Sequence, residues 1–407
     1  MNHIEQLLQT LAPKGVEFRK LGEVINILKG KQLNKEFLLD YGEYPVMNGG
    51  IHASGYWNEY NTDYPKIIIS QGGASAGYVN YMTSKFWAGA HCYAIELNSE
   101  KLNYKFLYYF LKNSQTILMK SQFGAGIPAL NKADIETLTI PIPPLEIQQE
   151  IVKILDAFTE LNTELNTELN ARKKQYQYYQ NMLLDFNDIN QSHKDAKMSV
   201  KTYPKRLKTL LHTLAPKGVE FRKLGEVLEY DQPNKYCVTS KEFDKSYPTP
   251  VLTAGKTFIL GYTNEKDNIY QASKNAPVII FDDFTTATQW VDFPFKVKSS
   301  AMKILFSKNP IINIRFIFFY MQTIPYNIGV EHARHWISRY SQLEVPIPPL
   351  EIQQEIVKIL DQFSLLTTDL LAGIPAEIKA RKKQYEYYRE KLLTFKPLTS
   401  NKEVDKE

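Results

Sequence analysis

The sequence has little cysteine, no long apolar run and no strong excess of charge of one sign. Its two cysteines, Cys92 and Cys237, are too few for a disulfide framework and lack the paired spacing of a zinc site, so we expect a reducing, cytoplasmic environment. The N-terminal residues lack a basic start followed by an apolar stretch, and no run reaches the ~18 apolar residues of a membrane helix. We therefore expect neither a signal peptide nor a membrane partner. The net charge of +5 allows an anionic partner without requiring one.

Motifs that bind phosphate or perform catalysis are also missing. A P-loop needs the pattern G-x4-G-K-[ST], but Pro250 stands where the first glycine before Gly255-Lys256-Thr257 belongs. The glycines of residues 123–126 are followed by Ile127-Pro128 rather than by a helix, which favours a surface loop. Asp282-Asp283 has no acid-and-lysine nuclease pattern close behind it, so a solvated or capping pair explains it better than a metal site does. We predict no catalytic residue and no metal ligand.

One denser cluster, EHARHW at residues 331–336, allows three interpretations. Two histidines three residues apart, together with a glutamate, could bind zinc on a helix. Arg334 and Arg339 instead indicate a surface that faces an anion such as nucleic acid. An ordinary surface segment is the third interpretation. Of the three, we favour nucleic-acid contact.

An internal repeat organises the chain, whose 407 residues suffice for roughly two to four domains. Three blocks occur twice with the same or nearly the same letters: 11–24 and 214–227, 141–156 and 346–361, and 171–179 and 380–388. The middles between them differ in sequence but keep a similar order of features. Strand-like Ile67–Ile69 matches Val278–Ile280, and residues 102–111 match 312–321 with the apolar spacing of a buried helix. Each half is therefore predicted to carry the same domain of mixed strand and helix.

The contrast between the constant blocks and the diverged middles indicates that these two kinds of segment have different roles. Two copies that must meet the same partner stay alike, whereas two copies that must recognise different things diverge. Recent gene conversion confined to the constant blocks is the alternative explanation.

A long helix is predicted after each Pro-Pro junction, where proline suits the first turn. Apolar residues from Ile147 to Leu183 recur every three or four positions, which predicts a helix of about 40 residues and roughly 60 Å. The second helix, from Leu350 to Leu393, is expected to pack against the first as an antiparallel coiled coil. Gly373 and Pro375 predict a break within it, with Pro375 near the first turn of a restarted helix.

The resemblance to a family rests on the blocks at 126–155 and 344–363 and on Leu-Gly-Glu-Val at 21–24 and 224–227. These resemble the specificity subunits of type I restriction-modification enzymes over essentially the whole chain. The resemblance implies an α+β fold: two mixed α/β target-recognition domains separated by two long antiparallel α-helices in a coiled coil, with an internal pseudo-two-fold repeat. The expected segments are a first recognition domain (1–143), a central constant helix (144–198), a second recognition domain (199–348), a C-terminal constant helix (349–396) and a charged tail (397–407).

The resemblance also implies a function. Such a subunit is not an enzyme; it reads a bipartite, asymmetric target in double-stranded DNA, one part per recognition domain. Two modification (methyltransferase) subunits dock on the constant helices and methylate adenine with S-adenosylmethionine. Restriction subunits complete a nuclease that uses ATP and Mg. No cofactor is expected to bind this chain itself.

A tandem repeat, TELN-TELN-TELN, occupies residues 159–170 of the first long helix. It resembles the short helical repeat whose copy number in this family is linked to the spacing of the target. Each unit adds ~6 Å of helix and ~40° of rotation beyond a full turn. One unit therefore corresponds to about one or two base pairs at ~3.4 Å each. Replication slippage in a solvated Thr/Glu-rich helix explains the origin of the repeat and is compatible with this role.

Candidate DNA contacts combine basic side chains for phosphates with amide, hydroxyl and basic groups for base edges. In the first domain they are Gln71, Ser75, Lys85, Lys120, Gln122 and Lys132. In the second they are Thr286, Thr288, Gln289, Arg334, His335 and Arg339. Candidate partner contacts lie on the helix stripes: Ile151, Leu155, Phe158, Tyr176, Ile356, Leu360, Phe363 and Tyr385. The ARKK runs at 171–174 and 380–383 are interpreted as solvated helix faces or partner contacts.

Two other functions remain open from the sequence. One is a duplicated coiled-coil adaptor that binds only proteins, and the other is an enzyme in its own right. The missing motifs disfavour the enzyme. Methylation mapping distinguishes the adaptor from a subunit that reads DNA.

Overall fold

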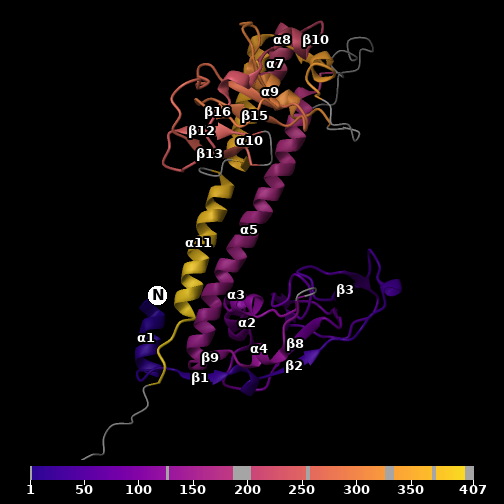
Figure 1. Cartoon of the computed structure of the whole chain (residues 1–407). Helices are drawn as coiled ribbons and strands as arrows, with labels where there is room; N and C mark the ends of the chain where they lie inside the picture. The colour runs from indigo at the N-terminus through magenta and orange to yellow at the C-terminus, as the bar shows by residue number, and fades with distance from the viewer. Residues whose placement is uncertain are drawn as a thin grey trace, which may run out of the picture. The chain divides into compact units, whose positions relative to one another are not determined.

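The computed structural model describes residues 2–124, 128–186, 203–253, 257–325, 334–368 and 373–398. The chain divides into two compact units: the first comprises Met1–Asn166 and Glu377–Glu407, and the second comprises Thr167–Ala376. Helix α5, Leu145–Leu184, supplies residues to both units. Figure 1 shows α5 as one uninterrupted helix. Its 40 residues confirm the length predicted from the apolar spacing.

The first unit begins with a mixed domain. Its elements are α1 (Asn2–Leu11), β1 (Glu17–Lys20), β2 (Ile25–Lys29), β3 (Tyr44–Met47), β4 (Gly55–Trp57), β5 (Lys66–Ser70), β6 (Val79–Met82), β7 (Trp87–Ala88), β8 (Cys92–Leu97), α2 (Tyr104–Asn113), α3 (Gln115–Lys120), α4 (Lys132–Glu136) and β9 (Thr139–Ile142). The strands form sheets in the orders β2-β8-β5-β6, β4-β3-β7 and β1-β9. Antiparallel β1 and β9, with Glu17 opposite Ile142, bring the start of the domain to its end.

The second unit repeats this order. Its elements are α7 (Lys205–Leu214), β10 (Glu220–Lys223), α8 (Leu224–Val227), β11 (Glu229–Asp231), β12 (Thr249–Leu252), β13 (Ile259–Thr263), β14 (Val278–Asp282), β15 (Thr288–Val291), β16 (Lys296–Val297), β17 (Met302–Phe306), α9 (Ile314–Met321), β18 (Glu344–Ile347) and α10 (Leu350–Thr368). Its sheets, β11-β17-β14-β15, β13-β12-β16 and β10-β18, match those of the first unit strand for strand. The predicted duplication and α+β fold class are confirmed.

The register of the central strands is also shared. Ile67 of β5 lies opposite Ile95 of β8, and Ile279 of β14 lies opposite Leu305 of β17. These isoleucines and leucines are among the fully buried side chains of their units. The continuous apolar runs in β5 and β14 are therefore explained by strands that are covered on both faces.

Helices α2 and α9 start slightly later than the aromatic spacing predicts. Asn103 and Asn313 precede them, and each side chain accepts hydrogen bonds from the first free backbone N–H groups of its helix. An asparagine in this position caps a helix because it satisfies donors that have no partner inside the helix. The caps define where the helices predicted at 102–111 and 312–321 begin.

Each unit pairs part of α5 with a later helix that runs in the opposite direction. In the first unit, Phe158 of α5 stacks on Tyr388 of α11 (Ile374–Leu392), with ring centroids 5.6 Å apart, while Leu155 shares a core with Leu392. In the second unit, Tyr179 of α5 stacks on Phe363 of α10 at 5.1 Å. Together these contacts confirm the predicted antiparallel helix pairing.

The predicted break in the second long helix is also present. Helix α10 ends at Thr368 and α11 begins at Ile374, with Pro375 in its first turn. A Cβ atom on Gly373 would lie 2.5 Å from the backbone oxygen of Leu365, so only glycine fits at this point. In the described part of the chain, no helix is both long and apolar enough to cross a membrane.

Candidate nucleic-acid interface

Loops from distant parts of the sequence meet at one end of the sheet β2-β8-β5-β6. The backbone N–H of Gln71 donates to the oxygen of His91 at 2.8 Å, and the N–H of Gly73 donates to the oxygen of Pro128 at 2.8 Å. We call this surface the first loop cluster; it consists of residues 48–51, 71–77, 89–91, 122–124 and 128–130. Loops that a rigid sheet holds together in this way are the usual carriers of binding residues.

Two glycines shape the first loop cluster. Gly77, at φ +86°, lies so close to α3 that a Cβ atom would be 2.7 Å from the carbonyl carbon of Leu118. Gly73, at φ +80°, has no neighbour within 4 Å of such an atom. Its backbone is therefore open to the approach of a ligand, while its left-handed conformation still favours glycine.

Three of the predicted DNA-contact residues lie in the first loop cluster. They are Gln71 and Ser75, both partly buried, and Gln122, whose Nε2 donates to the oxygen of Ala76 at 2.6 Å. Lys120 is exposed at the end of α3, two residues before Gln122. The fold thus brings Gln71, Ser75 and Gln122 together from two separate loops, and Lys120 precedes the second of these loops.

The other two predicted residues of the first domain have local partners away from this cluster. Lys85 donates from Nζ to the hydroxyl of Tyr60 at 2.8 Å and lies 4.0 Å from the centre of that ring. Lys132 lies on α4, where its Nζ is 3.3 Å from Oε1 of Glu136. The sequence offered no signal that would separate these lysines from Lys120, because loop lysines look alike until the loops are placed.

Sequence reasoning missed two exposed residues of the first loop cluster. His91 is exposed beside Gly72, and Phe123 is 50% exposed. His91 lies in a short loop without a motif, so only the convergence of loops identifies it. The surface-loop interpretation of residues 123–126 agrees with the exposure of Phe123, whereas residues 125–127 lie outside the described part of the chain.

Equivalent loops meet at the same end of the sheet β11-β17-β14-β15. The N–H of Asp283 donates to the oxygen of Ala301 at 3.3 Å, and the N–H of His335 donates to the oxygen of Asp283 at 2.9 Å. These contacts define the second loop cluster, residues 283–287, 299–301 and 334–341.

The predicted DNA-contact residues of the second domain lie in or near this cluster. Arg334 and Arg339 are exposed on its returning segment, and Gln289 is exposed on the neighbouring strand β15, next to partly buried Thr288. By contrast, His335 is only 1% exposed and Thr286 is 8% exposed. The side chains of His335 and Thr286 lie inside the unit and offer little surface for direct base contact.

The residues considered as metal ligands have other roles or lie outside the described ranges. Oδ1 of Asp282 accepts from the N–H of Phe284 at 2.9 Å, and its Oδ2 accepts from the hydroxyl of Thr285 at 2.6 Å. Asp282 therefore stabilises a turn, and both it and Asp283 are buried, so the interpretation as a solvated pair is wrong. Glu331 and His332, like Gly255 and Lys256, lie outside the described residues. Where the chain is described, no three His, Cys, Asp or Glu residues are grouped to hold a metal ion.

A buried glutamine in each constant block joins the recognition domain to its long helix. Oε1 of Gln148 accepts from the N–H of Asn103 at 2.7 Å, and its Nε2 donates to the oxygens of Lys101 and Pro143 at 2.8 and 2.6 Å. Gln353 repeats this arrangement, with partners Asn313, Ile311 and Pro348 at 2.8, 3.0 and 2.7 Å. Both glutamines are 0% exposed.

An aspartate eight residues after each of these glutamines forms a second junction between the long helix and the recognition domain. Asp156 accepts from Nζ of Lys105 at 2.8 Å and from the hydroxyl of Tyr109. Burial and this carboxylate both raise the pKa of the Tyr109 hydroxyl, which therefore stays protonated as a donor. Asp361 accepts from Nε of Arg315 at 2.8 Å. Part of the identity between the constant blocks is therefore explained by contacts within each unit.

Burial changes the role of several residues predicted to contact a partner. Ile151, Leu155, Ile356 and Leu360 are all 0% exposed inside their units. They have no surface for another protein and pack the helices instead. Phe158, Tyr176, Phe363 and Tyr385 are only partly buried, and all four contact neighbouring helices or cores.

Other identical residues of the constant blocks are exposed in both units. Tyr178 and Tyr387 are 61% and 60% exposed, and each packs edge-on against the tyrosine that follows it. The lysines of both ARKK runs and three residues at the start of each long helix are exposed as well: Lys173, Lys174, Lys382 and Lys383, and Glu146, Gln149, Lys153, Glu351, Gln354 and Lys358. Contacts within the chain do not explain why these residues are the same.

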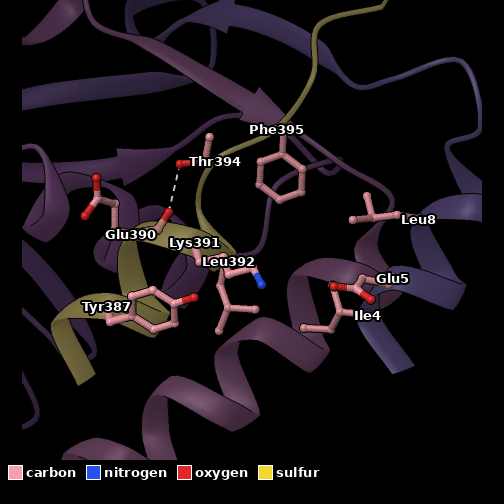
Figure 2. A pocket seen from close by; sticks show the side chains of 9 residues that line it. All are labelled: Ile4, Glu5, Leu8, Tyr387, Glu390, Lys391, Leu392, Thr394 and Phe395. Carbon is pink, nitrogen blue, oxygen red and sulfur yellow. Dashed lines mark hydrogen bonds between the residues drawn. The ribbon is translucent and has the colours of Figure 1, made fainter. Parts of the chain in front are cut away.

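A pocket of about 620 Å³ lies beside Tyr387 in the first unit. Figure 2 shows it between α1 and the end of α11, with Ile4, Leu8 and Phe395 around it and the charged Glu5 and Lys391 nearby. The hydroxyl of Thr394 donates to the backbone oxygen of Glu390 at 2.8 Å. The lining of this pocket thus combines apolar and charged side chains.

The cysteines do not supply a reactive thiolate. Burial raises the pKa of Cys92 to about 12, and it also raises the pKa of Cys237. A thiol is nucleophilic only when deprotonated, so both groups are largely inert near neutral pH.

Comparison with known proteins agrees with the two-fold organisation. The family model for the type I restriction modification DNA specificity domain matches twice, at residues 13–175 and 216–380. The EcoR124I/EcoR124II specificity subunit of Escherichia coli is 54% identical over 188 residues, which are 44% of this chain and 45% of that protein. A Haemophilus influenzae chain named as a type I restriction enzyme specificity subunit is 31% identical over 402 residues, which are 93% of this chain and 96% of that protein.

A solved structure supports the fold. The specificity subunit of a type I restriction-modification system from M. genitalium has a TM-score of 0.66 at 21% identity, covering 93% of this chain and 96% of that one. The repeated domain, the paired helices and both family matches lead to one conclusion: this chain belongs to the type I restriction-modification specificity family, as a non-catalytic DNA specificity subunit with two target-recognition domains.

Proposed function

We propose that the two loop clusters each read one half of a bipartite, asymmetric DNA target. The single observation that carries this proposal is that equivalent sheets present loops of different sequence at the same end. In the first cluster, Ser75 and Gln122, together with Lys120 at the end of α3, supply the hydroxyl, amide and basic groups that read base edges and phosphates, while Gln71, whose Oε1 is buried, supports them from the end of β5. In the second, Arg334 and Arg339, together with Gln289 on the neighbouring strand β15, supply comparable groups.

Methylation mapping tests this proposal. The chain is expressed with its neighbouring modification gene, and adenine methylation is mapped across the genome. We expect one bipartite motif that appears only when both genes are present. A map without a new motif would contradict the proposal and favour an adaptor that binds only proteins.

Exchange of one recognition domain gives a further expected result. Replacing residues 15–140 by the corresponding domain of another specificity subunit is expected to change one half of the motif and leave the other unchanged. The physical reason is that each loop cluster is built within its own unit. A change in both halves would show that the domains do not read independently.

We further propose that two modification subunits bind the exposed residues that the constant blocks share. Tyr178 and Tyr387, with the neighbouring lysines, form matching surfaces on the two units, and the pocket beside Tyr387 extends one of them.

The restriction subunits then join this complex. S-adenosylmethionine, ATP and Mg belong to these partner subunits, and the assembly works in the cytoplasm. We propose recognition domains at 1–143 and 199–348, helical segments at 144–198 and 349–396, and a charged tail at 397–407.

Replacement of the exposed tyrosines tests the partner surface. Tyr178→Ala combined with Tyr387→Ala is expected to weaken binding of modification subunits by about 2 kcal/mol or more, since exposed tyrosines often dominate protein interfaces. Titration of the purified chain with modification subunits measures this change. Tyr41→Ala is the control, because Tyr41 is 90% exposed and lies outside the repeated blocks. Equal binding by the double variant and the control would refute this surface.

A further inference from the structure

The residue that directly follows the buried central strand has the same position in both units but a different chemistry. Gln71 follows β5, and Asp283 follows β14. The residue facing the end of each strand from its neighbour differs as well: Tyr93 lies opposite Ile69, and Lys303 lies opposite Phe281.

In the second unit this position holds a buried ion pair. Oδ2 of Asp283 lies 3.7 Å from Nζ of Lys303, and the two side chains are 1% and 3% exposed. Lys303 also donates to Oε1 of Gln232, and its Nζ lies 4.8 Å from the ring centre of Tyr230. A buried charge without such partners would be strongly destabilising, so each member of this group depends on the others.

The same aspartate holds the segment that carries the two exposed arginines. Its Oδ1 accepts from the N–H groups of His335 and Trp336 at 3.1 and 2.9 Å, and its backbone oxygen accepts from the N–H of His335 at 2.9 Å. Trp336, 1% exposed, packs edge-on against Phe281 at 5.2 Å. Arg334 therefore directly precedes an anchored turn, and Arg339 lies within it.

The first unit achieves the same connection without charge. The backbone oxygen of Gln71 accepts from the N–H of Leu130 at 2.8 Å, and the hydroxyl of Tyr93 donates to the oxygen of Leu130 at 3.3 Å. The side chain of Gln71 lies beside the Tyr93 hydroxyl. Leu130 thus corresponds to His335, and both begin the return from the variable loops to the constant block.

Two of the four buried polar atoms without a hydrogen-bond partner in the described structure lie in these groups: Oε1 of Gln71 and Nε2 of His335; the others are Nε1 of Trp57 and Oδ1 of Asn162. Such atoms cost folding free energy and are uncommon in native proteins.

We propose that Asp283, paired with Lys303, is a positioning residue that sets the second loop cluster for recognition of its half-site, and that Gln71 with Tyr93 does the same for the first. The inference rests on the proposed DNA-reading function. The anchors themselves touch no base. The anchors hold the loops that contact the bases. An ion pair holds the loops in the second unit and uncharged groups hold them in the first, so the geometry of each loop cluster is set independently.

The test uses the full chain in complex with modification subunits and measures discrimination at each half-site. Discrimination is the ratio of affinities for the intact target duplex and for a duplex in which the bases of one half-site are replaced. Asp283→Ala is expected to lower discrimination at the second half-site about tenfold, comparable to the loss of one specific base contact, and to leave the first unchanged.

Lys296→Met is the matched control for this variant. Lys296 is another buried lysine of the second unit, paired with Glu265 at 2.6 Å in the sheet β13-β12-β16, and it has no contact with the second loop cluster that the structure describes. It is expected to lower the unfolding temperature but not the discrimination. Equal losses of discrimination in both variants, or none in Asp283→Ala, would overturn the positioning role.

A milder pair keeps the test valid if Asp283→Ala does not fold. Tyr93→Phe removes only the hydroxyl that donates to Leu130 and is expected to lower discrimination at the first half-site about threefold, the value of one modest hydrogen bond. Tyr104→Phe removes the hydroxyl that donates to Ile95 in the same sheet and is expected to have no such effect. Loss in both variants or in neither overturns the inference. A parent complex that does not discriminate at either half-site would instead overturn the proposed function.

Discussion

Deleting one TELN unit from residues 159–170 is expected to shorten the unread spacer of the DNA target by about one or two base pairs and to leave both half-sites unchanged. Methylation of the original target should then fall by at least ~100-fold, because a chain that fits one half-site would misplace its contacts at the other, and each lost base contact costs about 1–3 kcal/mol.

The structure indicates that this deletion does not damage either core. The boundary between the two units falls between Asn166 and Thr167, inside the repeat. The fully buried residues of α5 lie on either side of it: Leu155 belongs to the core of the first unit, and Leu183 belongs to the core of the second. Within the repeat, the hydroxyl of Thr159 and the amide of Asn162 bond to α5's own carbonyls. A shorter α5 should therefore still fold.

The spacer prediction has a control that changes the same repeat unit without changing the helix length. Thr163→Ala combined with Asn166→Ala alters one repeat unit but keeps the length of α5, and its spacer should be unchanged. Genome-wide methylation maps of the parent, the deletion and this control give the comparison. An unchanged spacer in the deletion variant would show that the length of α5 does not determine target spacing.

Replacing Gln353 by leucine is expected to destabilise the second unit by about 3–6 kcal/mol. Leucine has nearly the same size but would leave three backbone groups unpaired, at Asn313, Ile311 and Pro348. Two of these hydrogen bonds are only partly buried, so each loss costs about 1–2 kcal/mol. This loss is a large part of the ~5–15 kcal/mol that stabilises a typical domain. Recognition of the second half-site should be lost first.

The neighbouring glutamine provides the control for this substitution. Gln354 is exposed, and Gln354→Leu is expected to change the free energy of unfolding by no more than ~0.5 kcal/mol. Gln148→Leu and Gln149→Leu repeat the comparison in the first unit, where Gln148 is buried and Gln149 is exposed. Thermal and denaturant unfolding measure all four variants. Similar destabilisation by the buried and exposed substitutions would be inconsistent with the junction described above.

Only some residues of the candidate site could be predicted from local sequence patterns. Gln71 and Ser75 were identified because a glycine-rich loop follows a buried strand, and that signal is local. Lys85 and Lys120 carry the same charge, yet Lys85 pairs with Tyr60 and Lys120 ends α3 beside the first loop cluster. His335 was chosen for its basic neighbours but is buried, because its backbone bonds to Asp283.

The sequence by itself determined the features that depend on residues close together in the chain or on direct repetition. These are the duplication, one central strand and one buried helix in each recognition domain, the 40-residue helix α5, the interruption near Gly373 and the family. Apolar spacing and proline act over a few residues, so the sequence displays them directly.

Only the tertiary structure decided which residues meet. The pairing of Asp283 with Lys303, the junctions of Gln148 and Gln353, and the division of the constant blocks into buried helix packing and exposed Tyr178 and Tyr387 all depend on contacts between distant segments. Such contacts are selected by how strands register and how helices pack, and a linear pattern does not encode them at any fixed spacing.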